Sequence, residues 1–133
     1  MKFPLRYNRR FKVWSYQVSH NVLLLRSNSG RGFVDRVDVM FRDVAAFRLR
    51  RTYEKNLAVD LVPASDAFGL LGGDMETVEF DSYVFSVGAV GGVSGFVVAG
   101  TCHFAEDDME YGEPSAIDHS EFASRVTRSG NFP

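Results

Sequence analysis

The chain contains little cysteine and, over most of its second half, no basic residues. Its 133 residues include one cysteine, Cys102, which cannot form a disulfide within the chain and excludes a small disulfide-stapled scaffold. A reducing compartment is the simpler assumption. The positive charges of Lys2 and Arg6 are not followed by an apolar segment, which argues against a signal peptide. We therefore expect a cytoplasmic protein.

Charged side chains are absent from residues 82–105, the longest neutral stretch of the chain. Five glycines interrupt it, β-branched and aromatic residues dominate it, and Asp81 and Glu106 flank it, so it does not resemble a membrane span. The pattern predicts a buried β-hairpin that reverses at residues 91–95. The faces expected to point inward are Tyr83, Phe85, Val87 and Ala89 on the first strand, and Phe96, Val98, Cys102 and Phe104 on the next.

Other segments alternate in the same way. Residues 11–18 predict a strand with Trp14, Tyr16 and Val18 on one side, and residues 36–42 predict one with apolar residues inward and Arg36 and Asp38 outward. The remaining strand candidates are residues 22–25, 44–49, 57–62 and 75–80, with a helical alternative for 43–50.

The rest of the chain suggests short helices and loose ends. Residues 63–73 begin with a proline and end at a glycine pair, which allows about two helical turns, and Ser115 could start a second short helix. Residues 1–10 are predicted to be a basic arm that includes an edge strand, and residues 127–133 a frayed tail. We expect one mainly β domain over residues 1–133, an antiparallel sandwich or small barrel of about seven or eight strands with one or two short helical elements.

The small net charge of −2 hides two halves of opposite sign. Residues 1–55 contain thirteen of the fifteen Lys and Arg but only four acids, whereas residues 56–133 contain thirteen acids and two arginines. Such a division is typical of proteins with a charged partner, but paired strands from the two halves would also neutralise each other.

An acidic loop follows the neutral stretch and is the first candidate site. It combines clustered carboxylates, which steer the encounter with a basic partner, with apolar side chains that can anchor it. The predicted partner-binding residues are Glu106, Asp107, Asp108, Met109, Glu110, Tyr111 and Glu113. The first functional interpretation is a non-enzymatic protein that binds another, basic protein, as toxin-neutralising antagonists of the immunity type do. A homodimer formed through edge strands is also a hypothesis.

The basic first hairpin supports an alternative interpretation as a β-barrel that binds a ligand or a nucleic acid. Interleaved arginines and aromatic rings can neutralise phosphates and stack on bases. The residues concerned are Arg6, Arg9, Arg10, Trp14 and Tyr16. A sequence pI near 5.9 and the acidic second half make nucleic acid the less favoured partner.

A third interpretation is a metal-dependent enzyme built on His103 and Glu106. The acids after residue 105 do not have the spacing of a helical calcium loop, and Cys102 and His103 point to opposite faces of a strand. The sequence contains no catalytic signature, so we expect a protein without cofactor or bound metal.

Overall fold

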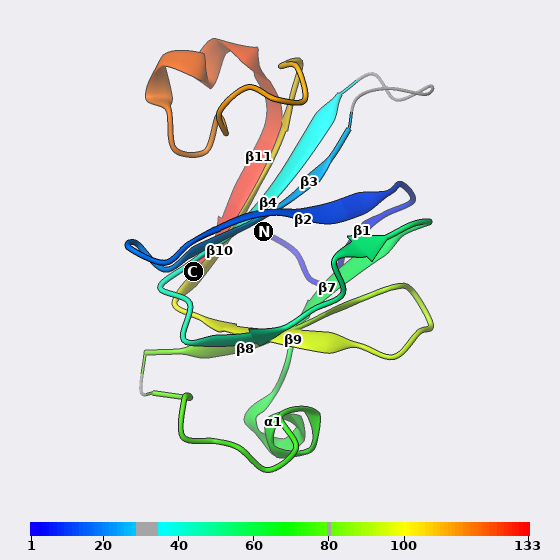
Figure 1. Ribbon diagram of the computed structural model, residues 1–133, viewed down its shortest axis with the longest axis vertical. Helices are drawn as coiled ribbons and strands as arrows, with labels where there is room; N and C mark the ends of the chain where they lie inside the picture. The colour runs from blue at the N-terminus through cyan, green and yellow to red at the C-terminus, as the bar shows by residue number, and fades with distance from the viewer. Residues whose placement is uncertain (29–34, 80) are drawn as a thin grey trace.

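The computed structural model describes residues 1–28, 35–79 and 81–133, whose strands form two antiparallel sheets packed face to face (Figure 1). The protein is therefore mainly β, as predicted, and takes the sandwich form of the two predicted alternatives. Sheet A contains, in spatial order, β1 (Leu5–Tyr7), β7 (Leu57–Leu61), β8 (Tyr83–Gly88), β9 (Gly95–Ala99) and β5 (Ala46–Arg48). Sheet B contains β11 (Val126–Phe132), β10 (Thr101–Asp107), β4 (Arg36–Arg42), β3 (Val22–Ser27), β2 (Phe11–Gln17) and β6 (Thr52–Tyr53).

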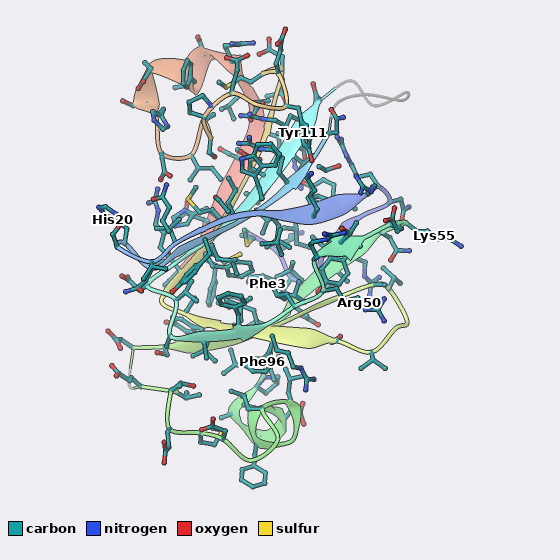
Figure 2. The ribbon with its side chains drawn as sticks, in the orientation of Figure 1. Phe3, His20, Arg50, Lys55, Phe96 and Tyr111 are labelled. Atoms are coloured by element: carbon teal, nitrogen blue, oxygen red, sulfur yellow. The ribbon has the colours of Figure 1, made fainter. Side chains whose placement is uncertain are left out.

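The core lies between the sheets and is built from the apolar side chains that alternate along the strands. Phe85 stands at its centre, with ring contacts to Phe3, Phe41 and Phe132, and Figure 2 shows Phe3 in the space between the sheets. Burial of such rings is the main favourable term in folding. The prediction that Val37, Val39 and Phe41 point inward is confirmed.

The neutral stretch forms the predicted hairpin of β8 and β9, but the expected inner face of its second part is wrong. Phe96 and Val98 point to the outer face of sheet A, whereas Cys102 and Phe104 lie in the core between the sheets. The reason is that the chain leaves sheet A after Ala99 and enters sheet B at Thr101, so one strand becomes two and the alternation shifts.

A bulge in β2 corrects the prediction for the first hairpin. Val13 pairs with Leu25 but Ser15 pairs with Leu24, so Trp14 is the extra residue between them. Trp14 therefore contacts Arg26 and Tyr111 on the outer side of sheet B, while Tyr16 packs against the core.

Three further segments differ from the expectations. Residues 127–133, expected to fray, belong to β11 except for the last residue and pair with β10. The described residues 75–79 contain a turn at residues 76–77 and no strand. The C-terminal helical element is a 3-10 helix, η1 (Ser120–Arg125), that begins later than Ser115.

Each sheet has a different cover on its outer face (Figure 1). The helix α1 (Ala64–Leu70) lies against the outer side of β8 and β9, where the prediction of a short helix is confirmed. The segment after β10 folds back over sheet B and leads into η1. Within the described part of the chain, no helix is long and apolar enough to cross a membrane.

Candidate functional site: a loop anchored by buried arginines

Four alternating charges lie in a row across the outer face of sheet B. Arg26 on β3 is opposite Asp38 on β4, and Arg36 on β4 is opposite Asp107 on β10. Arg26 donates two hydrogen bonds to Asp38, of 2.7 and 3.0 Å, and Arg36 donates two to Asp107, of 3.0 and 3.2 Å. A distance of 3.7 Å between Arg36 Nη2 and Asp38 Oδ2 links the pairs. All four side chains are at most 1% exposed.

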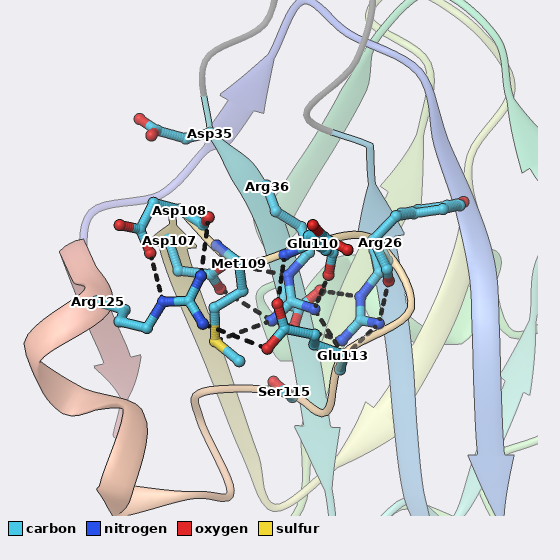
Figure 3. A network of polar contacts seen from close by, with 12 residues as sticks. Arg26, Asp35, Arg36, Asp107, Asp108, Met109, Glu110, Glu113, Ser115 and Arg125 are labelled. Atoms are coloured by element: carbon cyan, nitrogen blue, oxygen red, sulfur yellow. Dashed lines mark hydrogen bonds and ion pairs between the residues drawn. The ribbon is translucent and has the colours of Figure 1, made fainter.

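The part of the acidic loop that follows β10 (residues 108–114) covers this charged row and is bound to it through its backbone (Figure 3). Arg26 Nη1 donates to the carbonyl oxygens of Tyr111, at 2.7 Å, and Glu113, at 3.0 Å. Arg36 donates to the carbonyl oxygens of Glu110, Glu113 and Pro114 at 2.7 to 3.0 Å. The guanidinium groups therefore donate hydrogen bonds to carboxylates on one side and to loop carbonyl oxygens on the other. Nearly every N–H group of Arg26 and Arg36 thus has an acceptor.

The sequence explains the row but not its burial. Alternation along β4 places Arg36 and Asp38 on the outer face, as predicted, and they were expected in solvent. They are buried because the loop lies over them. Removing charges from water costs several kcal/mol per ion unless the geometry satisfies them, so a charged row of this kind fixes the conformation of whatever covers it.

The predicted partner-binding residues divide into buried and exposed groups. Asp107 and Met109 have no exposed surface, and Met109 Sδ lies 3.6 Å from Arg36. The exposed Asp108 and the half-buried Glu113 both form ion pairs with Arg125, at 2.8 and 3.3 Å. Glu110 is exposed, and no ion pair of its side chain is found among the described residues.

Glu106 lies at the inner edge of the sandwich, away from the other loop carboxylates. It accepts hydrogen bonds from Tyr7 at 2.6 Å and from Arg128 at 2.7 Å. Burial, together with the hydrogen-bonded Glu106 carboxylate, raises the pKa of Tyr7 well above its ordinary value, so the phenol keeps its proton.

The bulged Trp14 brings the first hairpin to the acidic loop. Its ring centroid lies 4.8 Å from that of Tyr111, and Arg26 lies beneath it at 4.9 Å. Lys12 stands over both rings, 5.4 Å from Trp14 and 5.6 Å from Tyr111. The exposed part of the site is therefore aromatic, with cations and carboxylates around it.

The residues of the alternative basic hairpin do not share one surface. Arg9 is buried and donates to Ser27 Oγ at 2.6 Å and to the carbonyl of Asn28 at 2.7 Å. Arg6 lies on β1 in sheet A and Arg10 pairs with Glu54. Trp14 and Tyr16 lie on opposite faces of β2, as described above.

The two residues of the predicted metal centre also point away from each other. His103 shares the outer face of β10 with Thr101, whose Oγ1 lies 2.9 Å from His103 Nε2, whereas Glu106 is on the inner side. Burial and the nearby Arg42 lower the pKa of His103. Burial raises the pKa of Cys102 to about 12, so its thiol is not ionised. In the residues the structure describes, no three His, Cys, Asp or Glu side chains are grouped to hold a metal ion.

Sequence reasoning missed Arg26, Arg36 and Asp38 as parts of the site. One usable signal was the position of Arg26 directly after the apolar run Leu23–Leu25. A strand this apolar is expected in the interior of a sheet, so a charged residue at its end is expected to be buried and paired.

Comparison of the chain with protein-family models, with curated proteins and with solved structures gave no significant match.

Proposed function

We propose that the protein binds another protein through the exposed part of the acidic loop, which we call the anchored loop because Arg26 and Arg36 hold it in place. This binding surface comprises Trp14, Asp108, Glu110, Tyr111 and Glu113. Asp107 and Met109, although predicted as contacts, would act from below by holding the loop in place. The observation that carries the proposal is the pair of buried arginines, which bind the loop backbone through five carbonyl oxygen contacts.

The physical reason concerns the cost of binding. An exposed loop loses conformational freedom when it binds, and a loop fixed beforehand does not have to pay that cost again. Aromatic residues such as Trp14 and Tyr111 supply most of the binding energy at protein interfaces, while charged residues around them set the approach. Because Arg125 neutralises much of the loop charge, the partner we expect offers an apolar pocket with a basic residue opposite Glu110.

Toxin neutralisation is the particular form of this activity that the acidic and aromatic character favours. It would place the protein in the cytoplasm beside a basic enzyme that it inhibits. The lone, buried Cys102 is compatible with that compartment.

The test is capture of partners from the native host with purified protein and a Tyr111→Ala, Glu110→Gln variant. We expect at least one protein retained by the wild type and lost with this variant, and calorimetry with the purified partner should show the same difference. The control is Val18→Ser, an exposed position outside the surface. A partner retained equally by the loop variant would contradict the proposal.

A nucleic acid is the second candidate, at a different place from the predicted hairpin. Arg48, Arg50, Arg51 and Lys55 are all exposed along the edge that connects β5 to β7, with Glu54 as the neighbouring acid. Such a row could bind phosphates, and its affinity for single-stranded nucleic acid would then fall steeply with added salt. Binding without that salt dependence, or no binding at low salt, would exclude it.

A further inference from the structure

A groove about 460 Å³ in volume lies beside α1. The helix is at the opposite end of the molecule from the segment that follows β10 (Figure 1). Its walls are almost entirely apolar. They include Val62, Ala67, Met75, Val78 and Val84, which come from α1, from β8 and from the segments on either side of α1. The volume falls in the range of ligand sites and is large enough for one or two large apolar side chains.

The helix beside this groove is lightly packed. Of its seven residues only Ala67 is buried, and Phe68 is 63% exposed on its surface. Figure 2 shows Phe96 on the side of sheet A that faces α1, where it joins a small cluster with Val84 and Val98. The apolar surface is thus only partly covered by the helix. Large exposed apolar patches on soluble proteins often mark binding sites.

The charged residues that adjoin the groove lining in the chain are all acidic, and we call them the rim acids. Six acids occur between residues 60 and 81, and all are exposed, namely Asp60, Asp66, Asp74, Glu76, Glu79 and Asp81. The sequence has no Lys or Arg from residue 56 to residue 124, and the structure shows no ion pair for these acids within its described ranges. Arg48 lies over the ring of Phe96, 5.7 Å from its centroid, at the side of this cluster. The acids near the groove therefore differ from those of the acidic loop, most of which form ion pairs.

We propose that the groove beside α1 binds a basic polypeptide segment that inserts an apolar side chain beside the helix. The apolar walls supply the affinity, and the unpaired acids select a segment rich in Lys or Arg and repel an acidic one. This surface is separate from the anchored loop and does not depend on the function proposed for it.

Methionine provides the readout, because the four methionines report on different places. Met75 lines the groove, Met40 and Met109 are buried near the anchored loop, and Met1 is at the N-terminus. The protein labelled with ¹³C at the methionine methyl groups is titrated with a helical peptide of leucine and lysine, and separately with its leucine and glutamate counterpart. We expect the lysine peptide to shift the Met75 signal and the glutamate peptide to leave it unchanged.

Matched charge variants sharpen the test. Glu76→Gln with Glu79→Gln removes two rim charges, and Glu54→Gln with Glu121→Gln removes two exposed charges elsewhere. The rim pair of substitutions should weaken binding of the lysine peptide by about tenfold, and the control pair should weaken it by much less. Ala64→Phe, at an exposed wall position, should narrow the groove and weaken binding without unfolding the protein.

The inference would be overturned by no shift of the Met75 signal, by equal shifts with both peptides, or by equal weakening of binding in both pairs of variants. A shift of Met109 in place of Met75 would also overturn it, and would instead support peptide binding at the anchored loop.

Discussion

The outer faces of the two sheets are covered by opposite means. On sheet B, a loop without regular structure is held by Arg26 and Arg36, whose buried guanidinium groups bond to its carbonyl oxygens. On sheet A, a regular helix, α1, rests on apolar side chains and leaves a groove beside it. The conformation of the loop over sheet B is therefore more closely determined than the position of the helix over sheet A.

This difference follows from the directionality of the forces. Hydrogen bonds to a guanidinium fork fix both distance and angle, so few loop conformations satisfy Arg26 and Arg36 together. Apolar contact is non-directional, and a helix can shift over it at low cost. We infer that the loop keeps one conformation, whereas α1 can shift over the apolar side chains beneath it.

The largest effect should come from removing one buried arginine. Arg36→Met leaves Asp107 without its partner in a site that excludes water, and we expect a loss of about 3–5 kcal/mol in the free energy of unfolding. Denaturant unfolding measures it. Arg36→Met combined with Asp107→Leu should recover part of the loss, because no unpaired charge of this pair remains, although the loop carbonyl oxygens still lack Arg36. Equal stability of the single and double variants would contradict the account of the charged row.

A truncation under α1 should cost less and act locally. Leu71→Ala removes a buried side chain from the small apolar cluster of Ala67, Val84 and Val98, and we expect a loss of roughly 2–3 kcal/mol, at the lower end of such substitutions. Hydrogen exchange should show faster exchange of the α1 amides and unchanged exchange in β4 and β10. Uniform acceleration over both sheets would show that the two covers are not independent.

The smallest expected effect is a response to pH on the loop side alone. His103 faces Thr101, Arg42 and Asp118, and its pKa is lowered in the folded state by burial and by Arg42. The unfolded chain therefore takes up this proton first, so stability should decrease as the pH falls through the ordinary histidine range, about 6.5, and then level off.

Urea unfolding near neutral pH and at mildly acidic pH measures this slope. His103→Gln should flatten it. An unchanged slope in that variant would assign the effect to other groups.

The sequence predicted the faces of strands better than what lies over them. Alternation identified the inward side of β4 and the hairpin of β8 and β9, because each depends on residues close in the chain. It failed at Trp14 and at Gly100, where one extra residue or a change of sheet shifts the register. These shifts depend on pairing with distant strands and have no local signature.

The candidate site was predicted in location but not in construction. The cluster of acids identified the loop, yet which acids are exposed depends on residues far earlier in the chain, as Asp107 depends on Arg36, 71 residues before it. Likewise, the residues after Thr127 lack strong apolar alternation, and they form a strand because they pair with β10. Long-range pairing, which one sequence does not reveal, decided both.

The most direct test of the central claim is the rate of amide hydrogen exchange in the acidic loop, measured by NMR. The amides of Met109, Glu110 and Glu113 are bonded to Asp107 Oδ1, Glu113 Oε1 and the Glu110 carbonyl, within a loop held by Arg26 and Arg36. Our account predicts that they exchange with protection comparable to that of β4 and β10, and that Arg36→Met abolishes this protection. Exchange as fast as in the exposed turn at His20 and Asn21 would show that the arginines do not fix the loop.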